Sequence, residues 1–119
     1  MKIKSSQTLV NEVLNEIITI SSNEVLELSS KKECNLIDIR DVRELENMGR
    51  IESSHHISRG MLGFWLDPKS PYFKEGKIDI DKWLVLFCAD GLRSALAAKS
   101  LNDMRFKNIC HIDGGFTSM

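Results

Sequence analysis

Long hydrophobic runs are missing from this sequence, and none approaches the roughly 20 apolar residues that a membrane-spanning helix needs. Lys2 and Lys4 lie near the N-terminus, but Glu12 and Glu16 interrupt the stretch that follows them. This pattern is not that of a secretory signal peptide. We therefore expect a cytoplasmic protein that does not enter a membrane.

Cysteine and excess charge are also scarce. The three cysteines are an odd number without paired spacing, which argues against a disulfide framework and fits a reducing compartment. Sixteen basic and 17 acidic residues give a net charge of −1, so the basic face that nucleic acids and anionic lipids require is not expected. We exclude both as partners.

What the sequence does contain is typical of one soluble domain. Its 119 residues are 42% hydrophobic, and no repeat or linker divides them, so we expect a single domain over residues 1–119. Apolar runs predict strands at 18–20, 35–39, 56–57, 84–87 and 108–112. Periodic apolar residues predict helices at 8–16, 60–66 and 94–104. Two further helices are predicted from their N-caps, one after Ser22 or Asn23 and one from Asp41 to residue 47. This alternation predicts an α/β fold, with a central parallel sheet and helices on both faces.

The loop between strand 84–87 and the helix that starts at Ser94 carries the strongest chemical signal. It begins with Cys88 and ends with Arg93. Loop amides and the positive end of the following helix would favour a thiolate at Cys88, which makes the thiol a nucleophile. Ligands of parallel sheets bind at the carboxyl ends of strands, where both Arg40 and Cys88 fall. We interpret this loop as a catalytic site.

Four motifs, in the order of the chain, resemble those of a rhodanese domain. They are Leu36-Ile37-Asp38-Ile39-Arg40 with Glu44, Gly49-Arg50-Ile51, Cys88-Ala89-Asp90-Gly91-Leu92-Arg93-Ser94, and His111-Ile112-Asp113-Gly114-Gly115-Phe116. Single-domain bacterial rhodaneses also share stretches similar to Arg59-Gly60-Met61-Leu62 and Trp65-Leu66-Asp67-Pro68. Each motif alone is weak, but the combination is specific.

The resemblance implies a thiosulfate-type sulfurtransferase in which Cys88 alternates between thiolate and persulfide, without a cofactor or a metal. The amides of Ala89, Asp90, Gly91, Leu92, Arg93 and Ser94 would bind the terminal sulfur. Arg93 would brace the loop or attract the anionic donor, and Arg59 could assist at the rim. Asp38 and Arg40 match the family's strand-end pair, with Arg40 holding loops together, and Glu44 is expected to pair locally.

The loop length helps to choose between related activities. Four residues separate Cys88 from Arg93, whereas related folds that act on phosphate or arsenate, resembling Cdc25-type phosphatases, place five there. The shorter loop suits one sulfur better than a tetrahedral oxyanion. A catalytically silent binding module and a phosphatase or arsenate reductase remain the alternatives. The expected partners are a small donor such as thiosulfate or a persulfide, a thiol or cyanide acceptor, and a possible protein acceptor, with the protein a monomer or weak homodimer.

Other features bear on these expectations. Asp90 places a negative charge inside the loop, which opposes the approach of thiosulfate. Cys34 and Cys110 are expected to be buried, the alternative being a resolving thiol, and His111 is expected to be a hydrogen-bonded strand residue. The family continues beyond Gly-Gly-Phe with a helix, which this sequence lacks. Either that helix is truncated, in which case we expect exposed apolar surface near Phe116, or the short end is natural.

Overall fold

A five-stranded parallel sheet forms the centre of the computed structural model, which describes residues 2–119. The strand order is β1-β5-β4-β2-β3, with β4 in the middle. The strands are β1 (Thr19–Ile20), β2 (Cys34–Asp38), β3 (His55–His56), β4 (Trp83–Phe87) and β5 (Ile109–Ile112). All strand pairs are parallel, so the carboxyl ends of β2, β4 and β5 lie at one edge of the sheet.

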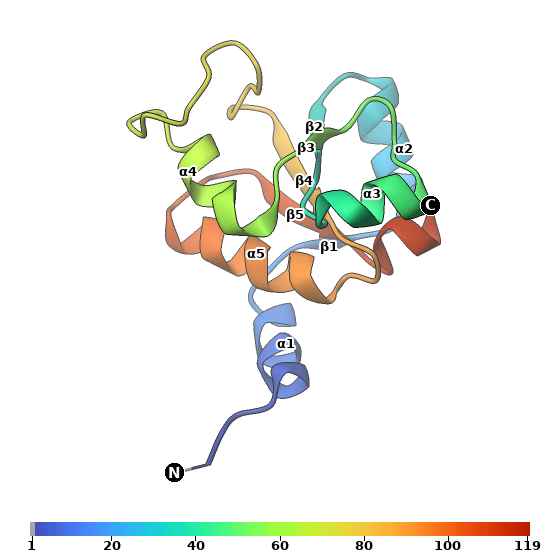
Figure 1. Cartoon of the computed structure of the whole chain (residues 1–119), viewed down its shortest axis with the longest axis vertical. Helices are drawn as coiled ribbons and strands as arrows, with labels where there is room; N and C mark the ends of the chain where they lie inside the picture. The colour runs from blue at the N-terminus through green and yellow to red at the C-terminus, as the bar shows by residue number, and fades with distance from the viewer. Residues whose placement is uncertain (1) are drawn as a thin grey trace.

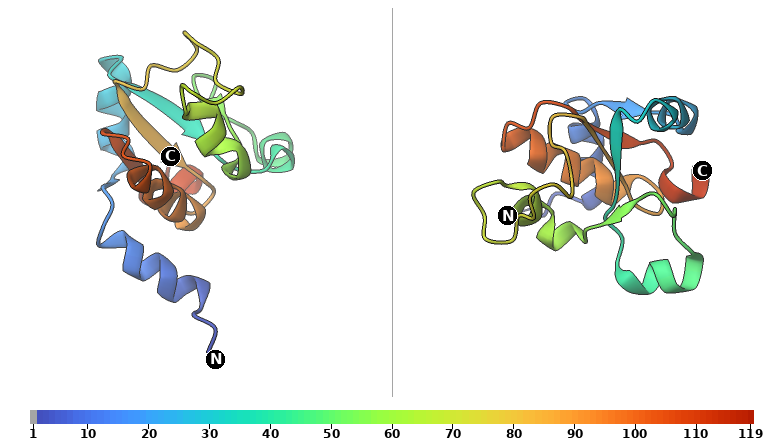
Figure 2. Two further views of the ribbon diagram at one scale, coloured as in Figure 1. Left: turned by 90° about the vertical axis from the view of Figure 1, so that its left-hand side faces the viewer. Right: turned by 90° about the horizontal axis from the view of Figure 1, so that it is seen from above.

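Helices cover both faces of this sheet, which confirms the predicted fold class. Figure 1 shows α4 and α5 on one side and α2 on the other, and α1, which projects at one end of the molecule in Figure 2, packs Val10 and Val13 against Ala95 of α5. The α-helices are α1 (Ser6–Leu14), α2 (Ser22–Ser30), α3 (Val42–Met48), α4 (Leu62–Leu66) and α5 (Leu92–Asp103). Two 3-10 helices, η1 (Arg59–Met61) and η2 (Gly115–Ser118), complete the described chain.

Alternation along β4 divides the hydrophobic core into two layers. Leu84 and Leu86 pack with residues of α4 and α5 on one face of the sheet. Val85 and Phe87 pack with residues of α2 on the other. Continuing the alternation, Cys88 belongs to the layer under α4 and α5. The nucleophile candidate is thus anchored by a strand that is buried on both faces.

The starts of α1 and α2 differ from the predicted ones, and their N-cap residues explain the difference. Ser5, whose side chain accepts a hydrogen bond from the Thr8 amide, starts α1 two residues earlier than expected. Ser21, and not Ser22 or Asn23, caps α2, because Glu24 lies three residues later and completes a capping box. Asp41 caps α3 as predicted.

Within residues 2–119, we find no helix with the length and apolar character that a bilayer crossing demands.

Candidate active site

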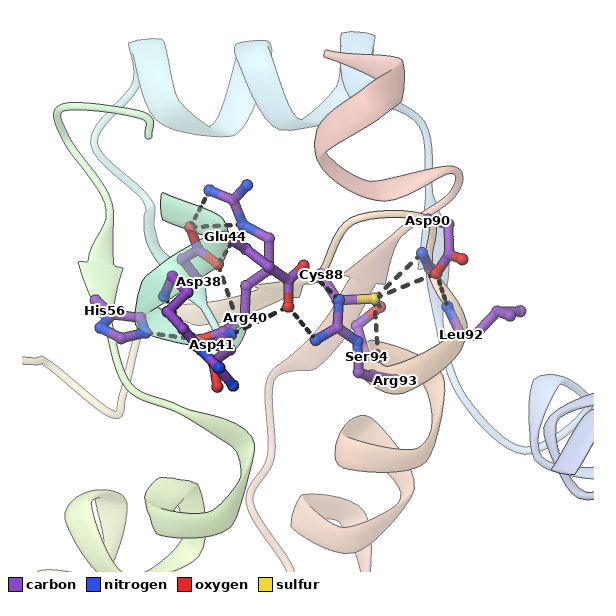
Figure 3. A network of polar contacts seen from close by, with 12 residues as sticks. Asp38, Arg40, Asp41, Glu44, His56, Cys88, Asp90, Leu92, Arg93 and Ser94 are labelled. Carbon is purple, nitrogen blue, oxygen red and sulfur yellow. Dashed lines mark hydrogen bonds and ion pairs between the residues drawn. The ribbon is translucent and has the colours of Figure 1, made fainter. Parts of the chain in front are cut away.

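The Cys88 sulfur lies at the entry to α5, fully buried, and receives hydrogen bonds from the loop that surrounds it (Figure 3). The amide of Gly91 donates to Sγ at 3.2 Å and the amide of Ser94 donates at 3.4 Å. The Ser94 hydroxyl lies 3.6 Å from the same sulfur. Because α5 starts at Leu92, the positive end of its dipole points at Sγ. Two amide donors, a hydroxyl within hydrogen-bond reach and a helix terminus therefore converge on one atom, an arrangement that stabilises a thiolate.

Gly91 allows the loop to turn its amides inward. Its φ of +95° lies in the left-handed region, which side chains with a Cβ rarely adopt. A Cβ at this position would also come within 3.3 Å of the Gly114 amide nitrogen and 3.4 Å of the Ile112 carbonyl oxygen. The loop therefore needs glycine both for its backbone conformation and for its close packing against the chain after β5.

The six amides expected to face the sulfur are not all directed at it. The Leu92 amide donates instead to the Asp90 carboxylate at 3.2 Å, since an aspartate side chain readily accepts from the amide two residues on. The carboxylate is also 3.9 Å from Sγ of Cys88. Asp90 thus lies beside the sulfur, and in this structure the hydrogen bonds to Sγ come from Gly91 and Ser94 alone among the loop amides.

Arg93 braces the loop by a bidentate ion pair with Glu44 of α3, at 2.7 and 2.8 Å. The local pairing expected of Glu44 is therefore only part of its contacts. Its carboxylate accepts from the Asp41 amide in the capping box of α3, but it also joins a residue 49 positions away. The hydrogen bond from Arg93 lowers the pKa of the Glu44 carboxyl, and the same bond raises the pKa of Arg93. Most of the positive charge of Arg93 is thus neutralised within the protein.

Asp38 and Arg40 form a buried ion pair at the carboxyl end of β2. The guanidinium binds both carboxylate oxygens of Asp38, with its shortest contact at 2.8 Å, and donates to the Gly49 carbonyl at 2.9 Å. The Phe116 ring lies 4.0 Å from the guanidinium carbon. Arg40 is 1% exposed, so it joins three segments of the chain and does not face solvent.

Arg59 is exposed at the start of η1. Its backbone amide donates to the Ile39 carbonyl at 3.2 Å, which places it beyond the end of β2. Within residues 2–119, no hydrogen bond or ion pair links the Arg59 side chain to the Cys88 loop. A role for Arg59 at the rim of the site stays a prediction.

The segment after β5 is hydrogen-bonded to the backbone of the Cys88 loop. The Phe116 amide donates to the Cys88 carbonyl at 2.8 Å, and the Thr117 amide donates to the Ala89 carbonyl at 3.1 Å. Phe116 itself is half-buried. The η2 helix therefore holds the backbone of Cys88 and Ala89 in place.

The other two cysteines belong to the opposite layer of the core. Cys110 is fully buried and Cys34 is half-buried, and both pack with residues under α2. Burial raises the pKa of the Cys110 thiol to about 12, and burial also raises the pKa of Cys34. The sheet separates them from Cys88. No cluster of three or more metal-ligating side chains was found among residues 2–119.

His111 and Thr19 complete a polar connection behind Cys88 that the sequence motifs did not identify. Ser94 Oγ is 3.0 Å from His111 Nδ1, and His111 Nε2 is 2.9 Å from Thr19 Oγ1. Burial lowers the pKa of His111. A histidine inside an otherwise apolar strand was the available signal, but only the pairing of β1 with β5 brings Thr19 beside it.

Comparison with known families matches residues 21–119 to the rhodanese-like domain. The chain belongs to that family. A thiosulfate sulfurtransferase, GlpE, from Shewanella oneidensis is 27% identical over 99 residues, which cover 83% of this chain and 88% of the relative.

Solved structures that are similar to this rhodanese-like domain include the following two. A protein of unknown function from Rhodopseudomonas palustris, described as a possible tyrosine phosphatase, is 42% identical with a TM-score of 0.87, covering 98% of this chain and 89% of that one. A polysulfide-sulfur transferase homodimer from Wolinella succinogenes is 30% identical with a TM-score of 0.71, covering 94% of this chain and 79% of that one.

Proposed function

We propose that this rhodanese-like domain is a sulfurtransferase that carries one sulfane sulfur on Cys88 as a persulfide. The observation that supports this most strongly is the convergence of the Gly91 amide, the Ser94 amide and the Ser94 hydroxyl on Sγ. Such preorganised donors stabilise an anionic sulfur without reorganisation during the reaction. The sulfurtransferase relatives described above support the same chemistry.

The first half of the reaction loads the enzyme. The Cys88 thiolate attacks the outer sulfur of a donor such as thiosulfate, and a new S–S bond forms at Sγ. The S–S bond of thiosulfate breaks, and its electron pair leaves with sulfite. Because Cys88 is 0% exposed, the loop must shift to admit the donor. The loop donors then hold the terminal sulfur of the persulfide as an anion.

The second half returns the enzyme to its starting state. A nucleophilic acceptor, cyanide or a thiolate on a small molecule or protein, attacks the terminal sulfur. The bond between that sulfur and Sγ breaks, and Cys88 leaves as a thiolate. The sulfur itself is the transferred group, so this cycle uses no cofactor. The site can operate within one chain, either as a monomer or in a weak homodimer.

Phosphatase activity is the alternative that the similar structure from Rhodopseudomonas palustris suggests, because that protein is described as a possible tyrosine phosphatase. Three features oppose it here. Only four residues separate Cys88 from Arg93, and the Arg93 guanidinium is bound bidentately by Glu44, so it is not free to receive an oxyanion. The loop amide of Leu92 is occupied by Asp90 as well. We therefore favour a single sulfur as the ligand of this loop.

Steady-state assays with both substrate classes test this proposal. We expect measurable transfer from thiosulfate to cyanide, abolished in Cys88→Ser, and hydrolysis of p-nitrophenyl phosphate near background. Cys110→Ala, buried across the sheet, is the matched cysteine control and should retain transfer. Phosphatase activity without sulfur transfer would contradict the proposal. Neither activity, in a folded protein, would instead support the silent binding module.

A further inference from the structure

His111 is a buried polar residue whose two ring nitrogens both have side-chain partners. It is 2% exposed and lies in β5 between residues that are fully or almost fully buried. Nδ1 contacts the Ser94 hydroxyl at 3.0 Å, and Nε2 contacts the Thr19 hydroxyl at 2.9 Å. A hydroxyl can donate and accept at the same time, and a neutral imidazole can do so through its two nitrogens. Each neighbour in this set can therefore pass a proton in either direction.

The contacts form one continuous path from the reactive sulfur to solvent. Sγ of Cys88 lies 3.6 Å from Ser94 Oγ, and the path continues through His111 to Thr19, which is exposed. The Cys88 side chain itself is 0% exposed. Its thiol therefore has no direct contact with bulk water while the loop is closed, but it is connected to water through these three side chains.

We propose that Ser94, His111 and Thr19 form a proton relay that carries the proton of the Cys88 thiol to solvent. The tautomer of His111 then indicates whether Cys88 is a thiol or a thiolate. This inference rests on the proposed function, in which Cys88 is the nucleophile. His111 acts here as a positioning residue, because it reaches the sulfur only through Ser94.

The proton transfer balances without forming an imidazolium. With Cys88 protonated, S–H donates to Ser94 Oγ, Ser94 O–H donates to Nδ1 of His111, and Nε2–H donates to Thr19 Oγ1. When each proton moves one step along its hydrogen bond, Thr19 releases one proton to water. The sulfur becomes a thiolate that accepts from the Ser94 hydroxyl. His111 stays neutral and changes from the Nε2–H to the Nδ1–H tautomer.

The surroundings of His111 favour this neutral form. Burial lowers its pKa, although Asp113, beyond the end of its own strand, acts in the opposite direction. The charged groups of the Cys88 loop are the Asp90 carboxylate and Arg93, which forms an ion pair with Glu44. Asp90 is the one other acceptor within reach of the thiol among the described residues, so it defines the alternative route for the proton.

Nitrogen chemical shifts of His111 test the relay directly. We would record the ¹⁵N shifts of both ring nitrogens in the full chain without any sulfur donor, across the pH range in which Cys88 becomes reactive toward iodoacetamide. We expect Nδ1 to gain its proton and Nε2 to lose its own, with the same midpoint as Cys88 alkylation. Shifts that stay constant through that midpoint, or that show a single histidine protonation at another pH, would overturn the relay.

Three variants separate the relay from its alternatives. Ser94→Ala keeps the backbone amide that binds Sγ but removes the connecting hydroxyl, so His111 should keep one tautomer while Cys88 still ionises. Ser94→Thr restores a hydroxyl and should restore the tautomer change. Asp90→Asn should leave the tautomer change of His111 intact. If the tautomer change is lost in Asp90→Asn, the proton of Cys88 leaves through Asp90, which would contradict the relay.

These readouts are independent of sulfur transfer. If the tautomer change is observed but thiosulfate loads no sulfur, the relay stands and the proposed function fails. If sulfur is loaded but the tautomer stays fixed, the proposed function stands and the relay fails.

Discussion

Asp90 is the residue that we expect to affect most directly which donor this loop accepts. Its carboxylate lies 3.9 Å from Sγ, and Arg93, the nearest cation of the loop motif, is already paired with Glu44. Two unit charges about 4 Å apart interact by about 4 kcal/mol at an effective dielectric of 20. Because Asp90 is exposed, solvent screening reduces this to a net effect on the order of 1 kcal/mol. The site should therefore discriminate against a dianionic donor.

Replacing Asp90 by asparagine tests that discrimination. Asp90→Asn keeps an oxygen for the Leu92 amide but removes the charge, so kcat/KM for thiosulfate should rise about fivefold, as expected for about 1 kcal/mol. Steady-state kinetics at low ionic strength measure this effect.

Asp67→Asn provides the matched control for Asp90→Asn. Its carboxylate accepts from the amide two residues on at 2.9 Å, the same local motif, but it lies after α4 and away from the loop. It should leave thiosulfate kinetics unchanged. If Asp90→Asn leaves kcat/KM for thiosulfate unchanged, as Asp67→Asn should, the Asp90 carboxylate does not influence the reaction with this donor.

At the level of elements, two segments fix the Cys88 loop. The η2 helix donates two amides to the Cys88 and Ala89 carbonyls, and α3 holds Arg93 through Glu44. Both segments follow the carboxyl ends of strands, so they meet at the same edge of the sheet. The geometry of the loop therefore depends on chain segments that contribute no atom to the reaction.

Gly115 is the position at which the η2 support is most sensitive. Its φ is +58°, and a Cβ there would collide with the carbonyl oxygen of Cys88. We expect Gly115→Ala to lower the free energy of unfolding by about 2–4 kcal/mol and to reduce sulfur transfer. Denaturant unfolding and turnover check the two effects.

Gly76→Ala separates backbone strain from collision. Gly76 has a φ of +82°, but a Cβ added there would meet no neighbouring atom within 4 Å, so alanine should cost only about 1–2 kcal/mol and spare activity. Equal losses of stability in the two variants would show that the contact with Cys88 is unimportant.

On the scale of the whole molecule, His111 makes stability depend on pH. Burial lowers its folded-state pKa, so below about pH 6.5 the unfolded chain binds a proton that the folded protein does not. The contribution is therefore present above that pH and is lost as the pH falls toward the folded pKa. The slope reaches at most about 1.4 kcal/mol per pH unit for one proton.

Urea unfolding of the wild type and His111→Asn between pH 7 and pH 5 measures this contribution. The wild type should lose stability more steeply as the pH falls. Burial also lowers the pKa of His55, which both proteins retain, so the difference between the two slopes isolates His111. Parallel slopes would mean that His111 is not held in its neutral form.

Local chemistry explains which parts of the fold and site were predictable. The strand–loop–helix around Cys88 and the cap at Asp41 depend on neighbouring residues, and the structure confirms both. The Glu44–Arg93 pair and the contact of Thr19 with His111 join residues 49 and 92 positions apart. Such pairs follow from strand order, which no local pattern encodes.

Intact mass spectrometry after treatment with thiosulfate tests the central claim most directly. We predict that the wild type gains the mass of one sulfur atom, that a thiol removes it, and that Cys88→Ser gains none while Cys34→Ala and Cys110→Ala gain as much as the wild type. A wild type that stays unmodified, or a sulfur that still loads onto Cys88→Ser, would contradict the assignment of Cys88 as the sulfur carrier.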